Sequence, residues 1–241
     1  MRLLIALSMR SRKLHFYLER TSVAAVRATS SVPVLALLLS DRDVLFALMK
    51  RCAGLLLSGS RSDVDPRRSE RPSHSRLGPV PWERNETDGV LLEAAEARRL
   101  PALAIGSRMQ RFHVFRRSTL DQDIASEPVN ALRHEQDAPG DWPAHRMRVK
   151  DVTILARLAG GTVAEVNNVP PQAVKAVGRD LRPIASSEDG ITETLLQEDP
   201  FILGAKRHPG TTFASDAFSQ AIFAQFPQKA EKGCDCPWRQ V

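Results

Sequence analysis

Short apolar runs recur along the first half of the chain, with longer mixed stretches between them. Runs of this length, bounded by polar residues, are typical of strands that are buried on both faces of a sheet. They are Leu3–Leu7, Pro33–Leu38, Gly54–Leu57 and Ala102–Ile105, and helix-like stretches lie near residues 17–28, 42–51 and 86–98. This alternation predicts an α/β fold, with a mostly parallel central sheet flanked by helices.

The second half of the chain adds shorter strand-like segments and a closing helix. Phenylalanine and alanine recur at helical spacing over Phe213–Phe226, which predicts an amphipathic helix with its aromatic rings in the core. Strands are expected at residues 145–149, 162–168, 182–186, 191–196 and 201–206.

Two polar stretches, residues 58–85 and 125–144, separate these elements and are expected to form long surface loops. The first contains four prolines with many serines and arginines. The chain is therefore expected to form a single domain over residues 1–228, followed by a polar C-terminal tail over residues 229–241.

The chain has 241 residues, of which 42% are hydrophobic, and this is enough for one large domain. It carries 34 basic and 28 acidic residues, a net charge of +6, and arginines scattered along the chain make up most of the excess. Such a surface could attract nucleic acid, but no recognition motif accompanies the charge, so a solvated basic surface is the stronger interpretation. Leu3–Leu7 is too short for a membrane span or a signal-peptide core, and no membrane attachment is expected.

Three cysteines, Cys52, Cys234 and Cys236, are too few for a disulfide scaffold and favour a reducing compartment, the cytoplasm by default. Cys234 and Cys236 form a Cys-x-Cys pair, but a structural zinc site needs four ligands and no second pair has suitable spacing. The sequence therefore predicts no metal site, and it gives no sign of a cofactor. Cys52 precedes an apolar run and is expected to be buried.

Residues 101–110, Pro-Ala-Leu-Ala-Ile-Gly-Ser-Arg-Met-Gln, read as a buried strand that turns tightly into a helix. This geometry presents a nucleophile in many hydrolases. The segment resembles the Gly-Ile-Cys-Arg-Gly-Met-Gln turn of class I glutamine amidotransferase-like proteins, in the γ-glutamyl-γ-aminobutyrate hydrolase branch. Further matches follow in family order nearly to the end of the chain: Gly54–Gly59, Asp63–Pro66, Thr119–Asp123, His145–Arg146, Val166–Asn167, Asp189–Gly190 and His208–Pro209.

The resemblance implies a cysteine nucleophile, a histidine that activates it and a glutamate that orients the histidine. In this chain Gly106 stands at the nucleophile position and Gly210 at the glutamate position, so only His208 is retained. Glycine has no side chain with which to attack a γ-glutamyl amide. The paired histidines of a family His-His-Gln segment are replaced by Pro170 and Pro171. The sequence therefore indicates a pseudoenzyme of this family.

An altered hydrolase that uses Ser107 and His208 is the alternative interpretation. On a helix one step turns a side chain by about 100°, so Ser107 does not inherit the direction of attack from position 106. Ser107 is expected to be a surface or capping serine at the start of the helix.

By the same resemblance, Gly59, Gln110 and Asn167 are expected to contact the substrate. The expected partner is a γ-glutamyl small molecule, and a basic pocket near Arg61, Arg108 and Arg207 is a candidate for holding its anionic group. The sequence carries no signal for an oligomeric state.

By the same resemblance, larger residues stand at five glycine positions of the family, namely Arg108, the pair Ser30–Ser31 and the pair Arg117–Ser118. Where such a position has a positive φ, each replacement is expected to cost about 1–3 kcal/mol unless the loop relaxes. The loops around the site are therefore expected to be rebuilt or unconstrained.

Overall fold

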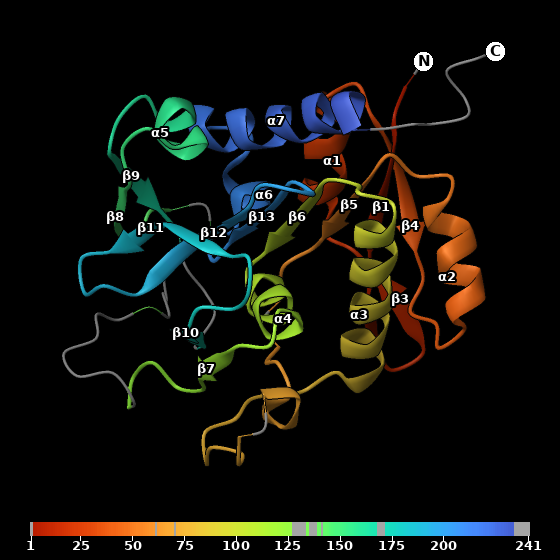
Figure 1. The fold of residues 1–241 in the computed structure, drawn as a ribbon, viewed down its shortest axis with the longest axis horizontal. Coiled ribbons are helices and arrows are strands. Elements are labelled where there is room, and N and C mark those ends of the chain that lie inside the picture. The colour runs from red at the N-terminus through yellow and green to blue at the C-terminus, as the bar shows by residue number, and fades with distance from the viewer. Residues whose placement is uncertain are drawn as a thin grey trace.

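The computed structural model describes residues 2–60, 62–69, 71–126, 134, 139–140, 142–167 and 172–233. Within these residues a nine-stranded sheet runs in the order β4-β1-β5-β6-β13-β12-β11-β8-β9 (Figure 1). Neighbours are parallel from β4 to β13 and antiparallel from β13 to β9. The strands are β1 (Leu4–Ser8), β4 (Val32–Ala36), β5 (Gly54–Leu57), β6 (Ala102–Ile105), β8 (His145–Val149), β9 (Val163–Val166), β11 (Arg182–Ser187), β12 (Thr192–Gln197) and β13 (Ile202–Ala205).

Helices cover both faces of this sheet. Helices α1, α5, α6 and α7 pack together on one face, and α2, α3 and α4 pack on the other (Figure 1). A short hairpin of β2 (Arg10–Arg12) and β3 (His15–Tyr17) and a pair of β7 (Thr119–Asp121) with β10 (Ala173–Ala176) lie apart from the main sheet. The helices are α1 (Arg20–Ala28), α2 (Arg42–Met49), α3 (Trp82–Ala97), α4 (Ser107–Phe115), α5 (Ile154–Ala159), α6 (Pro209–Thr212) and α7 (Ala217–Gly233).

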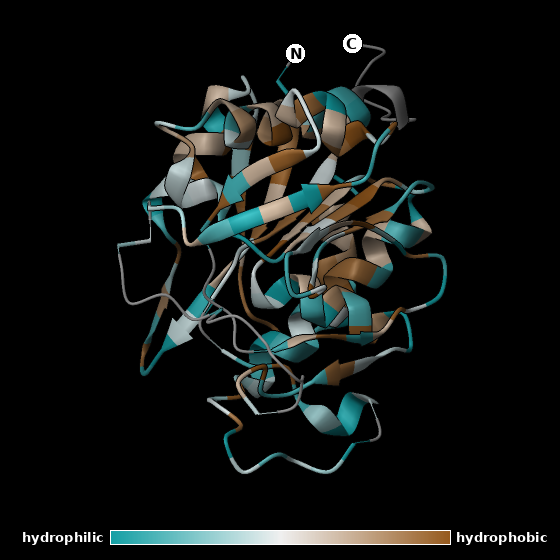
Figure 2. Ribbon diagram, turned by 90° about the vertical axis from the view of Figure 1, so that its left-hand side faces the viewer, coloured by the Kyte–Doolittle hydropathy of each residue, from teal (hydrophilic) through white to brown (hydrophobic). Residues whose placement is uncertain are grey.

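Alternating side chains of the central strands fill a separate core on each face. In β6, Leu103 and Ile105 join the cluster that contains the aromatic rings of α7, whereas Ala102 and Ala104 join the cluster that contains Leu91 of α3. Successive strand residues point to opposite faces, so a strand buried on both sides must be apolar throughout. Figure 2 shows the hydrophobic residues concentrated along these strands and the helix faces next to them.

The predicted α/β class, with a central sheet flanked by helices, is confirmed, and three strands, at residues 54–57, 102–105 and 145–149, have the expected bounds. The sheet is half parallel and half antiparallel, and not mostly parallel as expected. The early apolar runs form the parallel half of the sheet. The later segments form an antiparallel half, because β11 and β12 are joined by a turn of only four residues, 188–191, which is too short for a parallel crossover.

The closing helix differs from the expected Phe213–Phe226. It begins at Ala217, because the Asp216 carboxylate accepts hydrogen bonds from the backbone N–H groups of Phe218 (3.1 Å) and Ser219 (3.0 Å) and caps the first turn. It continues to Gly233, so residues 229–233 are helical although the sequence assigned them to the tail.

The segment over residues 58–85 is not a surface loop throughout. Asp63 and Val64 are buried. The Asp63 carboxylate accepts a hydrogen bond from Gly78 N (2.6 Å), and Val64 N donates to the side-chain oxygen of Gln172 (2.9 Å). These bonds hold the first part of the segment against the core, and its last residues already form the first turn of α3.

Cys52 is buried, as predicted, and burial raises the pKa of its thiol to about 11. Cys234 and Cys236 lie outside the described residues. Within the described part of the chain, no helix has both the length and the apolar character needed to cross a membrane.

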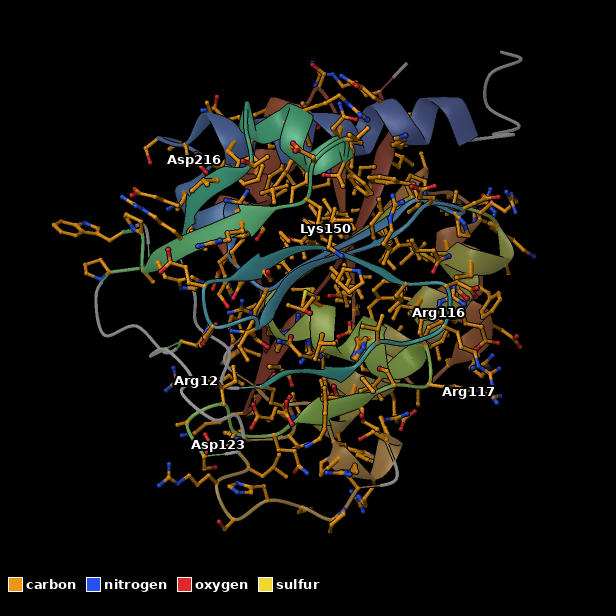
Figure 3. The ribbon with its side chains drawn as sticks, turned by 60° about the vertical axis from the view of Figure 1, so that its left-hand side comes forward. Arg12, Arg116, Arg117, Asp123, Lys150 and Asp216 are labelled. Carbon is orange, nitrogen blue, oxygen red and sulfur yellow. The ribbon has the colours of Figure 1, made fainter. Side chains whose placement is uncertain are left out.

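Two of the substituted glycine positions retain a backbone that favours glycine. Ser30 has φ 60° and Arg117 has φ 57°, and both side chains are exposed; Figure 3 shows Arg117 at the periphery of the molecule. Arg108 lies within helix α4, so no such strain arises there. The cost expected from the sequence therefore applies at Ser30 and Arg117 and not at Arg108.

Ser30→Gly and Arg117→Gly are each expected to raise the free energy of unfolding by about 1 kcal/mol. Glycine relieves the steric cost of a positive φ, and its greater freedom in the unfolded chain offsets part of this gain. Chemical denaturation measures the change. Asp151→Gly, in an exposed turn without a positive φ, is the control and should be neutral or destabilising; equal gains at all three positions would contradict the assignment of strain.

Candidate functional site

The site lies at the carboxyl ends of β5, β6 and β13, which are neighbours in the parallel half of the sheet. At the end of β6, Gly106 has φ 60° and ψ −129° and is followed directly by α4. Its N–H donates to the carbonyl of Ala205 (2.8 Å) and its carbonyl accepts from Met109 N (2.9 Å). This sharp strand-to-helix turn is the predicted elbow, with glycine at its apex.

The imidazole of His208 packs against two glycines. A Cβ built on Gly106 would lie 2.4 Å from His208 Nε2, and a Cβ built on Gly59 would lie 2.4 Å from His208 Cε1. Both distances are far shorter than a non-bonded contact allows. The ring therefore occupies the space in which a side chain at position 106 would begin, and Gly59 borders the same space.

Asn167 holds the turn that carries His208. Its Oδ1 accepts a hydrogen bond from His208 N (3.0 Å), and its Nδ2 donates to His208 O (3.3 Å) and to Thr211 Oγ1 (2.8 Å). The sequence predicted a contact with substrate for Asn167. That contact stays a prediction, and the hydrogen bonds give Asn167 a positioning role beside its place in the wall of a nearby cavity.

Gln110, the other polar residue expected to bind substrate, is buried in α4 and its Nε2 donates to the backbone carbonyl of Gln172 (3.0 Å). It ties α4 to the segment before β10. Gly210 lies in α6, and a Cβ built on it would come no closer than 3.4 Å to Ser22 Oγ. Position 210 therefore has room for a side chain, and the chain supplies none.

Ser107 is not the surface or capping serine that was expected. It is 2% exposed, and the N-cap of α4 is Gly106. Its Oγ hydrogen-bonds the Oγ of Ser60 (3.0 Å) and donates to the Ser60 carbonyl (3.1 Å), and it accepts from Arg108 Nε (3.3 Å). Ser107 therefore fastens the elbow to the loop after β5.

The predicted basic pocket is not formed by Arg108 and Arg207. Arg108 is fully buried and its Nη1 lies 2.8 Å from the carboxylate of Asp88 on α3. Arg207 instead pairs with Asp216 (3.6 Å) and lies 4.0 Å from the ring centre of Phe218. Each guanidinium pairs with a different acid, which sequence spacing does not reveal. Arg61 lies outside the described residues.

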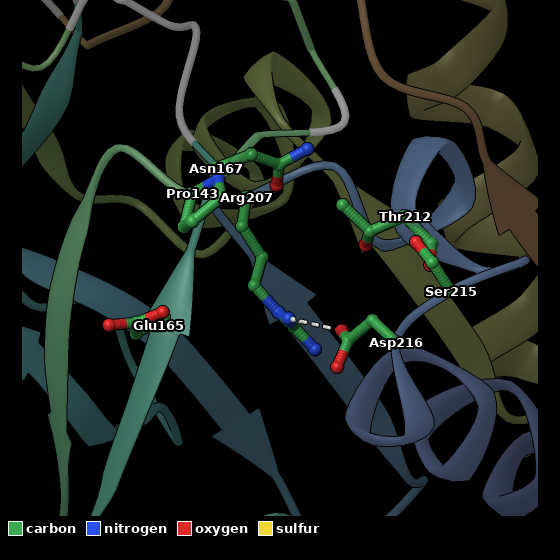
Figure 4. A pocket seen from close by; sticks show the side chains of 7 residues that line it. All are labelled: Pro143, Glu165, Asn167, Arg207, Thr212, Ser215 and Asp216. Atoms are coloured by element: carbon green, nitrogen blue, oxygen red, sulfur yellow. Dashed lines mark hydrogen bonds and ion pairs between the residues drawn. The ribbon is translucent and has the colours of Figure 1, made fainter.

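Arg207 faces a cavity of about 220 Å³ between β9 and the start of α7 (Figure 4). Asp216 and Glu165 supply two carboxylates to its wall, and Figure 4 shows the guanidinium turned toward Asp216. Burial lowers the pKa of Arg207 to about 10, although Asp216 opposes this shift. With two acids and one base, the cavity does not favour an anion.

A buried charge cluster lies on β8, β12 and the end of β13, and it has no counterpart in the sequence-based predictions. His134 Nε2 lies 2.8 Å from Asp189 Oδ2, His145 Nε2 lies 3.3 Å from Glu193 Oε1, and Lys206 Nζ lies 3.5 Å from His134 Nδ1. Its members are up to 72 residues apart in sequence, so no local motif announces them.

The ligand atoms of His134, His145 and Glu193 lie within 4.8 Å of one another, and three such ligands are the set of many catalytic zinc sites. The buried ammonium of Lys206 already places a positive charge beside them, and it opposes a divalent cation at the same position. Burial alone would raise the pKa of Glu193, but Lys206 and the two histidines lower it to about 2. The charge of Glu193 is therefore compensated within the cluster.

Lys206 links this cluster to pH. Burial lowers the pKa of Lys206 to about 8, against the pull of Glu193 and Asp189, whereas an unfolded lysine keeps an ordinary pKa near 10.4. Between these values the unfolded chain binds a proton that the folded chain does not, so this group makes the free energy of unfolding rise with pH from about 8 to about 10.

Lys206→Met should remove this rise. Denaturant unfolding at pH 7.5, 8.5 and 9.5 is expected to show a stability difference, natural protein minus variant, that increases with pH. Lys150→Met, at an exposed lysine labelled in Figure 3, is the control and should give a flat difference. A flat difference for Lys206→Met as well would mean that Lys206 stays protonated in the folded protein.

The contact between Gly106 and His208 gives a second prediction. Gly106→Ala is expected to lower the free energy of unfolding by about 2–4 kcal/mol, because the new methyl group overlaps the imidazole and φ is positive. Gly210→Ala, where a Cβ meets only ordinary contacts, should change it by less than about 1 kcal/mol.

A double variant separates the overlap from backbone strain. In a protein that already carries His208→Ala, Gly106→Ala should destabilise by at least about 1 kcal/mol less than it does in the natural protein, because the imidazole that overlaps the new methyl group is absent. Additive effects of the two substitutions would show that the ring does not fill this space in solution.

Comparisons with known proteins identify the family and support the fold. Residues 6–210 match the Peptidase C26 family. Gamma-glutamyl-gamma-aminobutyrate hydrolase of Escherichia coli O157:H7 is 30% identical over 196 residues, covering 78% of this chain and 76% of that protein. Protein NtpR of Enterococcus hirae is 28% identical over 217 residues, covering 88% of this chain and 89% of that protein.

Solved structures extend the likeness to the fold. The glutaminase domain of Trypanosoma brucei CTPS with bound acivicin superposes with a TM-score of 0.64 at 12% identity, covering 96% of this chain and 95% of that chain. Together with a family match that spans most of the chain, these relationships show that this protein belongs to the Peptidase C26 family of class I glutamine amidotransferase-like proteins.

Proposed function

We propose that this chain is a pseudoenzyme that binds a γ-glutamyl small molecule and does not hydrolyse it through a thiol. The observation that carries this proposal is the packing of His208 against Gly106, with 2.4 Å between Nε2 and the position of a Cβ. Acyl transfer needs a nucleophile next to the substrate carbonyl. The apex of the elbow supplies none.

The position of the imidazole adds to this argument. In this architecture a reacting carbonyl would lie between the elbow and the loop that carries Gly59, close to backbone N–H groups that can stabilise an oxyanion. The ring of His208 lies in that space against both glycines. A γ-glutamyl ligand therefore binds beside the ring or displaces it, and neither arrangement brings a nucleophile to the carbonyl.

Hydrolysis through Ser107 has less support. The neighbouring Arg108 guanidinium (3.3 Å) would favour an ionised Ser107, but the hydroxyl is 2% exposed and is turned to Ser60. A substrate carbonyl has no access to it without movement of the loop after β5.

The ligand class rests on the family. Relatives at 28–30% identity are named gamma-glutamyl-gamma-aminobutyrate hydrolases, and the chain covers about three quarters of their length. A cytoplasmic location stays a prediction from cysteine usage.

The test measures turnover and binding with the same ligand. The natural protein is expected to release no product from γ-glutamyl-γ-aminobutyrate or glutamine above the buffer rate, while calorimetry detects binding of γ-glutamyl-γ-aminobutyrate. Ser107→Ala should leave both results unchanged. The double variant Gly106→Cys, Gly210→Glu restores the family side chains, and turnover by it would show that the remaining site is intact.

Turnover by the natural protein that disappears in His208→Ala would overturn the proposal, because it would require a substitute nucleophile. Loss of that turnover in Ser107→Ala would identify Ser107 as the nucleophile. Absence of both turnover and binding would reject the ligand class.

A further inference from the structure

A second cavity, of about 440 Å³, lies next to the elbow, between the β2–β3 hairpin and the start of α3. Two arginines and four hydroxyl groups carry its polar wall: Arg10, Arg84, Ser11, Tyr17, Ser60 and Ser62. None of the described residues that line it carries a carboxylate. The cavity is thus unlike the one at Arg207, in which acids outnumber bases.

The positive charge around this cavity is only partly neutralised. Arg84 Nε lies 3.6 Å from Asp88 Oδ2, but the same oxygen lies 2.8 Å from Arg108 Nη1. Arg10 pairs with Glu19 at 2.9 Å. In the part of the chain that the structure describes, three guanidinium groups therefore share two carboxylates, which leaves one positive charge largely buried.

The guanidinium of Arg10 also has hydrogen-bonding capacity to spare. Its Nε and Nη2 are buried, and neither donates a hydrogen bond within the described residues. Buried donors of this kind ordinarily have a partner, so one is expected to come from outside the protein. Arg84 contributes a fixed charge, because its Nη2 donates to the carbonyl and the hydroxyl of Ser58.

Repulsion among these groups is visible in the titration of Arg84. Burial, with the charges of Arg108 and Arg10, lowers its pKa to about 9, against the attraction of Asp88. A negatively charged group beside Arg84 would reverse this effect. Because this pKa is above 7, Arg84 remains positively charged at neutral pH and can attract an anion.

Hydroxyl groups complete the wall of the cavity and connect it to the elbow. Ser60 Oγ lies 2.7 Å from Ser62 Oγ and 3.0 Å from Ser107 Oγ, and Ser62 Oγ accepts from Arg108 Nη2 (3.1 Å). A hydroxyl group can rotate so that it donates a hydrogen bond to an oxyanion. Guanidinium groups donate to oxyanions as well.

We infer that this cavity binds a compact oxyanion, a carboxylate or a phosphate group of a small molecule, between the guanidinium groups of Arg10 and Arg84. Its volume is within the range of small-molecule sites, and its single net charge matches one anionic group. The inference does not depend on the proposed function, because it rests on the side chains that line this cavity and on no property of γ-glutamyl ligands.

Calorimetry tests whether this cavity binds an anion. Inorganic phosphate and succinate are each titrated into the natural protein at low ionic strength. Binding of at least one in the millimolar range or tighter is expected. The anion that binds more tightly indicates the class of ligand: phosphate indicates a phosphorylated small molecule, and succinate indicates a carboxylate. Absence of binding by both overturns the inference.

Variants locate the site. Arg10→Gln should weaken binding at least tenfold, whereas Arg12→Gln, an exposed arginine of the same hairpin labelled in Figure 3, should leave it within twofold. Equal affinities for these two variants would place the anion elsewhere and reject the cavity.

Glu19→Gln separates binding from a structural role of Arg10. It removes the acid that neutralises Arg10, so it should tighten anion binding at least twofold, whereas a purely structural ion pair predicts no gain. Ser62→Ala is the reserve if Arg10→Gln fails to fold, and it should weaken binding about threefold; an unchanged affinity there would count against the cavity.

Discussion

The side-by-side placement of β5, β6 and β13 is the constraint on which the rest of this site depends. Parallel pairing of β6 with both neighbours brings their carboxyl ends to one edge of the sheet. Gly59, Gly106 and His208 follow these ends, although up to about 150 residues of chain separate them. Neighbouring ends of this kind form the ligand sites of open α/β sheets. Contacts among the three residues therefore follow from strand order before any side chain is considered.

Around that edge, buried polar side chains link the elbow, the loop after β5 and helix α3. Arg108 reaches from α4 to Asp88 of α3, and Ser107 reaches from the elbow to the loop after β5. Such buried pairs stabilise little in net terms, since desolvation of the charges offsets most of the attraction. Their effect is to fix one arrangement of the elbow, the loop and α3, and they leave little room for the loop to move.

The sequence predicted the scaffold well because its signals are local. Runs such as Gly54–Leu57 and Ala102–Ile105 are apolar throughout and bounded by polar residues, so a buried strand is the only element that fits. The elbow was also predictable, since Gly106 sits between such a strand and a helix. The family pattern named Ser30 and Arg117 as positions where a positive φ would be costly, and the structure supplied the φ values.

The chemistry of the side chains was less predictable, because partners in space are distant in sequence. Arg108 and Arg207 looked like one basic pocket, but Asp88 and Asp216 neutralise them separately. The cluster of His134, Glu193 and Lys206 gave no local signal. Ser107 was expected at the surface because a helix start is usually exposed, and the loop after β5 covers it here. The likeness to the family indicated that positions 106 and 210 lack a side chain. It did not predict that the ring of His208 fills the space next to Gly106.

The ring of His208 between Gly59 and Gly106 also makes substitutions at these positions depend on one another. A cysteine at position 106 would bring its Cβ within 2.4 Å of His208 Nε2, so this substitution is penalised until the histidine changes rotamer. A side chain becomes acceptable at the apex of the elbow only after position 208 or its surroundings have changed. The order in which substitutions occur therefore decides whether each one is tolerated.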